Sequence, residues 1–342
     1  MNQQIDNVRN DLQGKRILLL YARFFGYDQE VKKALENRGA IVDLYDARAN
    51  INSVEKAIKK ITRLFYFKKQ QKFHINVMKE NNRKNYDFIY TNEHLGEIVL
   101  KKYRDFFPNA KLILYLDDSV QNLFHINRTF PLYDRVITFD REDAKKYNIE
   151  FRPLFFSEAY DKDSISDVEI KYDVCFIGTC HSDRLKVINE VIAKNDIKNI
   201  FLYCYLPSSF MYYYYKLTLP SFKKTNKSFF KYKSIPSSKV VEKMIQSRAI
   251  LDIQHPKQTG LTMRTIETVG LKKKLITTNE DIRKYDIYNE GNVLVIDRNN
   301  PIINESFLTR EFQPLSDKQY YYYSINGWID YIFLNKDGRN SI

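Results

Sequence analysis

The chain has 342 residues, of which 44% are hydrophobic and 28% charged, and its 55 lysines and arginines against 42 acidic residues give a net charge of +13. This composition excludes a disordered chain, a collagen-like chain and a disulfide scaffold, and at roughly 100–200 residues per domain the length predicts two domains. No uncharged stretch reaches the ~20 apolar residues of a membrane span. The polar N-terminus lacks the apolar core of a secretory signal.

The first half of the chain alternates short apolar runs with helical patterns. One helix is expected to end at Gly39, a second to cover the basic stretch 56–84, a third to cover 95–106 and a short one to begin at Arg141. Strands are expected over 15–21, 40–45, 86–91, 111–116 and 135–139. Strands that alternate with helices predict a parallel sheet covered on both faces.

The alternation lapses between 151 and 171 and then restarts. Helices are expected over 184–193, 237–248 and 263–269, and strands over 173–177, 199–205, 249–253 and 274–278. We therefore predict an α/β protein with an N-terminal domain over 1–155, a linker over 156–170 and a second domain over 171–317. Residues 318–333 read as one apolar helix within a final segment, 318–342, that either crosses back to the first domain or packs on the second.

Three cysteines make an odd number in a long chain, which indicates reduced thiols and a cytoplasmic location. Cys175, Cys180 and His181 lie close in sequence, but their spacing matches no zinc pattern. Cys175, Cys180 and Cys204 are therefore expected to be small buried thiols.

The most informative segment covers 251–279. A strand ends at Ile253, and a polar loop leads to a helix that Thr262 can cap, so the free amides of that helix form an anion site. Arg264 and Glu267 are three residues apart and share one helix face. Arg264 can hold a phosphate and Glu267 a ribose diol; the alternative is an ion pair beside an ordinary helix cap.

Residues 255–267 (HPKQTGLTMRTIE), followed by LKKKLITTN, resemble the donor-binding region of GT-B glycosyltransferases. The narrower resemblance is to bacterial enzymes of lipopolysaccharide and capsular polysaccharide biosynthesis. Further segments fall in the order that this group shows: YLDDS at 115–119, YDRVITFD at 133–140, RPLF at 152–155 and FIG at 176–178.

The resemblance implies two Rossmann-like domains facing across a cleft, with a nucleotide-sugar donor on the C-terminal domain and an acceptor on the N-terminal one. Glu267 matches the family's ribose contact and Arg264 a position near the pyrophosphate. His255, Gln258, Gly260 and Thr262 join them as donor-binding candidates. Position 259 is threonine where many relatives have a glutamate, which leaves the stereochemical outcome open. The family type implies no metal and no cofactor besides the nucleotide sugar as co-substrate.

A second loop follows the first strand of the second domain. Gly178 lets the backbone approach a ligand there, and His181 and Arg184 can reach phosphate oxygens. The alternative is a polar turn capped by Ser182 or Asp183.

Candidates for a general base on the acceptor hydroxyl follow strands of the first domain. Asp118 comes first and His94 second; Asp117 and Asp118 point in different directions and do not act as a pair. The alternatives are a helix cap for Asp118 and a packed imidazole for His94. His74 and His125 have no functional context and are expected in the core or on the surface.

The segment Phe201–Lys233 holds 12 aromatic residues, six lysines and no acidic residue. Tyrosine and lysine together suit a membrane surface. Packing on its own domain and binding of single-stranded nucleic acid are the alternatives. The basic stretch 56–84 is either a second contact of this kind or a solvated helical face.

We therefore expect a cytoplasmic glycosyltransferase, peripheral on the inner face of the cell membrane, that moves a sugar to a surface polysaccharide or lipid-linked glycan. No nucleic acid partner is expected. The alternatives are a GT-B-like transferase of a non-sugar group such as glycerol phosphate, and a non-catalytic α/β protein that binds nucleic acid or membrane.

Overall fold

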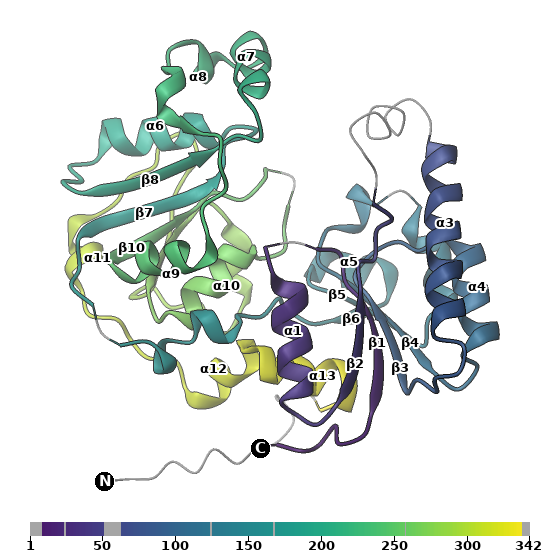
Figure 1. Cartoon of the computed structure of the whole chain (residues 1–342). Helices are drawn as coiled ribbons and strands as arrows, with labels where there is room; N and C mark the ends of the chain where they lie inside the picture. The colour runs from purple at the N-terminus through teal and green to yellow at the C-terminus, as the bar shows by residue number, and fades with distance from the viewer. Residues whose placement is uncertain are drawn as a thin grey trace. The chain divides into compact units, whose positions relative to one another are not determined.

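The computed structural model describes residues 9–23, 25–50, 63–123, 125–166, 168–256 and 258–336 (Figure 1). The chain divides into two compact units. The N-terminal unit comprises Met1–Pro153 and Ile329–Ile342, and the C-terminal unit comprises Leu154–Trp328. Residues 154–170 thus belong to the second unit.

Within the described residues, the N-terminal unit has one sheet of six parallel strands in the order β2-β1-β3-β4-β5-β6. The strands are β1 (Arg16–Leu20), β2 (Ile41–Tyr45), β3 (Phe88–Thr91), β4 (Lys111–Leu116), β5 (Arg135–Thr138) and β6 (Glu150–Phe151). The helices are α1 (Tyr27–Glu36), α3 (Arg63–Glu80), α4 (Glu97–Phe106), α5 (Arg141–Tyr147) and the end of α13 (Ile325–Leu334).

Alternation along β3 shows how helices cover both faces of this sheet. Ile89 belongs to the core cluster that also includes residues of α3 and α4, which lie side by side in Figure 1. Its neighbours Phe88 and Tyr90 point to the opposite face, where their rings lie 5.5 and 6.0 Å from that of Phe333 in α13. The strands are apolar on both faces because helices cover both.

Within the described residues, the C-terminal unit has a second parallel sheet of six strands in the order β12-β11-β10-β7-β8-β9. The strands are β7 (Tyr172–Thr179), β8 (Ile200–Tyr205), β9 (Phe230–Lys231), β10 (Ser247–Asp252), β11 (Lys274–Thr277) and β12 (Val293–Val295). The helices are α6 (Arg184–Lys194), α7 (Ser209–Thr218), α8 (Pro220–Lys223), α9 (Ser237–Ile245), α10 (Met263–Gly270), α11 (Glu305–Thr309) and α12 (Asp317–Tyr323).

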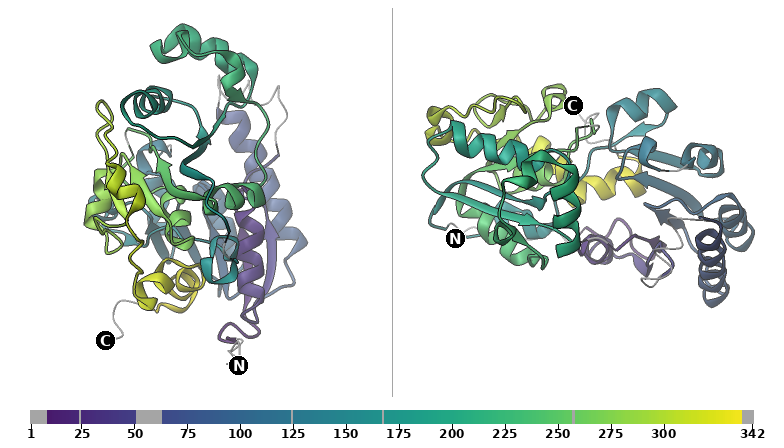
Figure 2. Two further views of the ribbon diagram at one scale, coloured as in Figure 1. Left: turned by 90° about the vertical axis from the view of Figure 1, so that its left-hand side faces the viewer. Right: turned by 90° about the horizontal axis from the view of Figure 1, so that it is seen from above.

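The first strand of this second sheet along the chain, β7, lies in the middle of the sheet. The chain runs from β7 outward to β9, returns to the other side of β7 as β10, and runs outward again to β12. That is the strand order of a Rossmann sheet. Figure 2 shows the same unit from two further sides, with α7 and α8 standing away from the sheet in the left-hand view.

The predicted fold class, α/β with two Rossmann-like units, is confirmed by these two sheets. All nine predicted strands are present, whereas β6, β9 and β12, which are two or three residues long, were too short to give a pattern. Residues 56–62 of the basic stretch lie outside the described residues, and the rest of the stretch forms α3 and the turn that follows it. The three cysteines are buried, as predicted, and burial raises the pKa of Cys175 to about 12.

The prediction of one helix over 318–333 is wrong, because the helix breaks at Ser324 into α12 and α13. Phe156 lies beside the break and forms an isolated bridge with Ser324. Its amide donates to Tyr323 O at 2.9 Å, and its carbonyl accepts from the Ile325 amide at 2.9 Å. A distant segment therefore takes up backbone groups that a continuous helix would have paired internally.

Buried charges fix α13 in the N-terminal unit. Arg38 is buried between two carboxylates, with Nη2 2.5 Å from Asp330 Oδ1 and 2.5 Å from Asp11 Oδ2. Arg135 Nη1 donates to the carbonyl oxygens of Tyr331 at 2.9 Å and Ile332 at 2.7 Å. These two carbonyls lie in the last turn of α13, so Arg135 caps the helix.

Replacing the carboxylate on α13 tests this attachment. Asp330→Ala leaves Arg38 buried with half of its counter-charge, and we expect the free energy of unfolding of the N-terminal unit to fall by about 3 kcal/mol, measured by urea titration. Lys101→Ala, which breaks the exposed pair with Glu97, is the matched control and should not change it. Equal midpoints for the two variants would show that the buried pair contributes nothing.

Candidate functional site

The candidate donor site lies at the carboxyl ends of β7 and β10. These strands are neighbours, but the chain leaves them toward opposite sides of the sheet, so the loops that follow them diverge. A crevice at such a point is where α/β sheets of this kind bind ligands. The predicted residues from 178 to 184 and from 255 to 262 follow these two strands, although Gly178 lies inside β7 and the loop begins at Cys180.

Two arginines connect the diverging loops. Arg184 donates from Nε to Ile253 O at 2.6 Å and from Nη1 to Thr179 O at 2.9 Å, so it joins the ends of both strands. Burial lowers the pKa of this guanidinium. Arg298, which follows β12, donates to Gln254 O at 2.7 Å and pairs with Asp183 at 2.9 Å. The structure thus gives Arg184 backbone partners at the place where the sequence suggested a phosphate contact.

Two histidines face each other across the two loops. The ring centroids of His181 and His255 are 5.9 Å apart. Burial first, and then the charges of Arg184 and His255, lower the pKa of His181 to about 4, with Asp183 opposing them. His181 is therefore neutral at pH 7, so one ring nitrogen carries a proton that can be donated to an anion.

The start of α10 is fixed by a buried carboxylate. Thr262 Oγ1 accepts from the Thr265 amide at 3.1 Å, which confirms the predicted cap. Asp252, at the end of β10, accepts from Thr262 Oγ1 at 2.6 Å and from Thr265 Oγ1 at 2.7 Å. Before the helix, Gln258 Nε2 donates to Gly260 O at 3.2 Å. Side chain and backbone together hold the first turn of α10 at the crevice.

Arg264 and Glu267 share one face of α10, as predicted, and form an ion pair of 2.6 Å between Nη1 and Oε2. Glu267 is buried, and Arg264 Nη1 also lies 2.7 Å from Met244 Sδ. Both side chains reach Tyr160, whose pKa is raised first by burial and then by Glu267. The ion pair that the sequence left as an alternative is therefore present, and any role toward a nucleotide is additional to it.

At the carboxyl ends of β1, β3 and β4 in the N-terminal unit, one asparagine bonds to two neighbours. Asn92 Oδ1 accepts from the Ala22 amide at 2.8 Å, and Asn92 Nδ2 donates to Asp117 Oδ2 at 2.7 Å. The chain leaves β1 and β3 on opposite sides, so this is the switch point of the first sheet. Glu93, the next residue, pairs with Arg48.

The two neighbouring aspartates have different surroundings. Asp118 Oδ1 accepts from the Ser119 amide at 2.8 Å and from Asn122 Nδ2 at 2.9 Å, which binds it to its own turn. Asp117 keeps contact with solvent, yet the protein around it displaces enough water to raise its pKa to about 6. The charge of Glu93 adds to this rise, and the hydrogen bond from Asn92 opposes it.

The predicted histidines outside the donor site differ among themselves. His94 is half-buried, and burial lowers its pKa, with Glu93 opposing. His74 is a core residue, 2.9 Å from Tyr103 Oη and 3.2 Å from Ala47 O, and burial lowers its pKa to about 4.

Sequence reasoning missed Asn92, Asp252 and Arg298. Asn92 and Arg298 act on residues that are distant in sequence, whereas Asp252 acts on Thr262 and Thr265 across the loop that follows its own strand. In the part of the chain that the structure describes, no three His, Cys, Asp or Glu side chains gather as metal ligands would. The described helices include none with the length and apolarity to cross a bilayer.

No family model matches the chain, and no curated protein matches it in sequence. Solved structures do match it in fold. A UDP-forming α,α-trehalose-phosphate synthase from Burkholderia xenovorans is 11% identical, with a TM-score of 0.60 over 95% of this chain and 99% of that one. Sucrose-phosphate synthase from Thermosynechococcus elongatus is 13% identical, with a TM-score of 0.57 over 87% and 88%.

The N-terminal domain of trehalose-6-phosphate phosphatase from Candida albicans is 8% identical, with a TM-score of 0.62 over 94% of this chain and 96% of that one. The chain has the GT-B fold. At these identities the likeness describes the fold, and the chemistry has to be argued from the residues at the two switch points.

The raised pKa of Asp117 has a consequence for stability. The folded state holds a proton on this carboxyl between about pH 4 and 6 that the unfolded state releases, so ionisation of Asp117 lowers stability as the pH rises through that window. We expect Asp117→Asn to raise the melting temperature at pH 7.5 and to leave it unchanged near pH 4, measured by calorimetry.

Asp118→Asn is the matched control, since its carboxylate accepts two hydrogen bonds within its own turn. It should not raise the melting temperature at either pH. A gain for Asp117→Asn that is the same at both pH values would contradict the shifted pKa.

Proposed function

We propose that this protein is a glycosyltransferase that binds a nucleotide-sugar donor through its C-terminal unit and an acceptor hydroxyl through its N-terminal unit. The observation that carries the proposal is the switch point of the second sheet, where His181, His255 and the capped start of α10 all follow the carboxyl ends of β7 and β10. The similar synthases of sucrose phosphate and trehalose phosphate support it, since their names describe glycosyl transfer.

The diphosphate of the donor would bind at the start of α10. Thr262 caps one amide there, and the other first-turn amides carry the partial positive charge of a helix N-terminus. His181 adds a neutral hydrogen-bond donor and Arg264 a guanidinium. During transfer, the bond between the anomeric carbon and the diphosphate oxygen breaks, and these groups stabilise the charge that develops on the leaving diphosphate.

The ribose would bind beside the ion pair on α10. Glu267 is the residue that the family resemblance assigns to the ribose diol, and its Oε2 is held by Arg264. In this proposal a ribose hydroxyl donates to the Glu267 carboxylate, so one side chain contacts the sugar and also orients the guanidinium that faces the diphosphate.

Asp117 is the general base that we favour for the acceptor. With a pKa of about 6, Asp117 is ionised at pH 7 and above, yet it binds a proton more strongly than an ordinary aspartate does. A base of this strength suits proton transfer from a hydroxyl. The acceptor oxygen attacks the anomeric carbon while its proton passes to a carboxylate oxygen. Asp118 and His94 remain the competing candidates. A single displacement of this kind inverts the anomeric centre, so the configuration of the product tests the use of a base.

A surface polysaccharide or lipid-linked glycan is the acceptor class we propose, on the resemblance of residues 255–267 to enzymes of lipopolysaccharide and capsule biosynthesis. The donor is identified first. UDP, GDP, CMP, dTDP and their sugar conjugates are compared in thermal-shift assays. The nucleotide that binds should stabilise the protein by about 2.7 kcal/mol at a hundredfold excess over Kd. A response to CDP-glycerol instead would indicate transfer of glycerol phosphate, and no response to any nucleotide would contradict the proposal.

Ribose recognition by Glu267 is tested with the nucleotide that binds. Wild-type protein should bind it at least about tenfold more tightly than its 2′-deoxy counterpart, because a hydrogen bond to a charged group contributes about 1.5–3 kcal/mol. Glu267→Gln should weaken binding of the ribonucleotide and remove most of this discrimination, measured by calorimetry.

The same pair of ligands separates ribose contact from support of Arg264. If Glu267 only orients Arg264, Glu267→Gln weakens the binding of both nucleotides equally, and the preference for the ribonucleotide persists. Glu242→Gln on the exposed face of α9 is the control and should bind both nucleotides as wild type does.

The base is tested by comparing two variants at saturating donor. Asp117→Asn should lower kcat by about 10²–10⁴-fold without changing donor affinity, whereas Asp118→Asn should keep most of the activity. In the wild type, kcat/KM should fall as the pH drops below about 6, where Asp117 takes up a proton. A large loss in Asp118→Asn alone would move the role to Asp118, and a loss in neither would leave His94→Gln to be measured.

A further inference from the structure

The C-terminal unit carries a helical projection between β8 and β9. It covers residues 206–229, includes α7 and α8, and is called here the 206–229 projection. Figures 1 and 2 show α7 and α8 standing away from the sheet in views that differ by 90°. Cys204 and Tyr205, at the end of β8, pair with Phe230 and Lys231, so the projection leaves and rejoins the sheet at its carboxyl edge.

Aromatic rings pack the projection onto the core of the C-terminal unit. The rings of Phe222 and Phe230 stack 5.1 Å apart, Tyr212 lies 5.6 Å from Phe230, and Tyr215 lies 5.1 Å from Phe222. Tyr212, Phe222 and Phe230 are buried, and Tyr212 Oη donates to Thr225 O at 3.2 Å. These contacts fix which face of α7 points inward.

The opposite face of α7 is apolar and exposed. Phe210, Tyr213, Tyr214 and Leu217 are 72%, 54%, 50% and 83% exposed. They occupy positions i, i+3, i+4 and i+7, the spacing of a continuous stripe along a helix, which in a globular protein normally faces the core. Outside this stripe, no window of eight residues in the described chain holds more than two exposed large apolar side chains.

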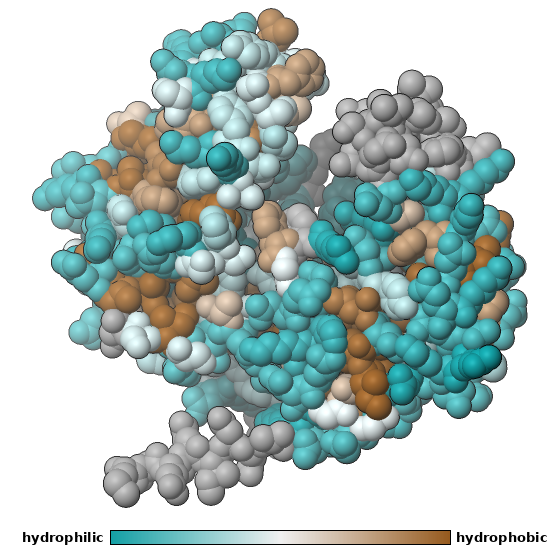
Figure 3. All heavy atoms as spheres, viewed as in Figure 1, coloured by the Kyte–Doolittle hydropathy of each residue, from teal (hydrophilic) through white to brown (hydrophobic). Residues whose placement is uncertain are grey.

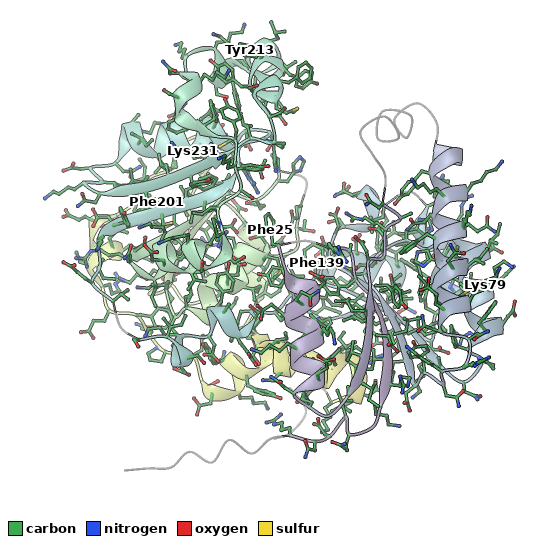
Figure 4. The ribbon with its side chains drawn as sticks, viewed as in Figure 1. Phe25, Lys79, Phe139, Phe201, Tyr213 and Lys231 are labelled. Carbon is green, nitrogen blue, oxygen red and sulfur yellow. The ribbon has the colours of Figure 1, made fainter. Side chains whose placement is uncertain are left out.

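Side chains at the tip of the projection show this exposure. Brown apolar atoms lie there in Figure 3, and Figure 4 places Tyr213 at the outer end, remote from Phe201 and Lys231 on the sheet. A stripe of this size exposed on a folded element marks an interaction surface.

The charges around the stripe have one sign. Residues 201–233 contain six lysines and no aspartate or glutamate. Lys216, in α7, and Lys223 and Lys224, at the end of α8, are exposed, and the ammonium of Lys227 lies 5.1 Å from the Tyr213 ring. A protein partner would need a complementary acidic surface, whereas an anionic bilayer offers negative headgroups above an apolar interior.

We propose that the 206–229 projection docks the protein on a membrane surface with anionic lipids, inserting Phe210 and Leu217 below the headgroups. Tyr213 and Tyr214 lie at headgroup depth, where their rings contact acyl chains and their hydroxyls stay hydrated. Lys216, Lys223 and Lys224 meet lipid phosphates. Because the projection joins the sheet at the same edge as the crevice of β7 and β10, docking brings the donor site that we propose toward a lipid-linked acceptor.

Sedimentation of the full chain with vesicles tests the docking. We expect binding to vesicles of phosphatidylcholine mixed with phosphatidylglycerol, weak binding to phosphatidylcholine alone, and loss of most binding at about 0.5 M salt. Phe210→Ser with Leu217→Ser, and separately Lys216→Gln with Lys223→Gln and Lys224→Gln, should each lower the partition coefficient by about tenfold or more.

Ile302→Ser is the control for the stripe, because Ile302 is 53% exposed in the same unit but lies outside the projection. It should bind vesicles as wild type does. Nucleotide binding without vesicles should be unchanged in all these variants, so failure of docking and failure of the proposed function give different results.

Absence of binding to anionic vesicles, or binding that both multiple variants retain, would overturn the proposal. So would a dimer in vesicle-free solution that Phe210→Ser with Leu217→Ser dissociates, since a second copy would then cover the stripe. Preferential binding of the lysine-rich surface to single-stranded oligonucleotides over anionic vesicles would overturn it as well.

Discussion

One guanidinium connects the two strand ends on which the candidate donor site depends. Arg184 holds the carbonyls of Thr179 and Ile253 within hydrogen-bond distance of a single side chain, directly below the point where the chain turns to opposite sides of the sheet. The loops above it diverge, and this arginine ties their bases together. The start of α10 is fixed by the Asp252 carboxylate at the end of one of the same strands.

In the first sheet, a neutral side chain connects the strand ends. Asn92 connects the Ala22 amide to the Asp117 carboxylate, and an amide brings no charge to the site. The protein around this carboxylate raises its pKa by displacing water, and the hydrogen bond from Asn92 only partly opposes that rise. One side chain thus connects two strand ends at each switch point, a charged one in the second sheet and a neutral one in the first.

Local patterns were sufficient for much of this architecture. Apolar runs predicted the longer strands, the position of Thr262 predicted the cap of α10, and the three-residue spacing of Arg264 and Glu267 predicted their shared face. Arg298 and Asn92 escaped prediction because their partners lie 44 and 70 residues away along the chain. Only the fold brings such residues together.

Two further differences between pattern and structure have the same origin. The break between α12 and α13 depends on Phe156, which lies far from Ser324 in sequence. The stripe on α7 has the periodicity of a core-facing helix, yet the other face of α7 is the buried one, because Tyr212 contacts Phe230 and Tyr215 contacts Phe222. Periodicity identifies an apolar face but does not say what covers it.

The return of α13 to the N-terminal unit determines the order in which the chain can mature on the ribosome. The C-terminal unit is continuous from Leu154 to Trp328, whereas the N-terminal unit needs Asp330 to neutralise Arg38 and Phe333 to cover β3. The unit synthesised first is thus completed last. Until the segment after Trp328 has emerged, Arg38 lacks the carboxylate of Asp330 and one apolar face of the sheet is uncovered. The nascent chain depends on these late residues to complete its first unit.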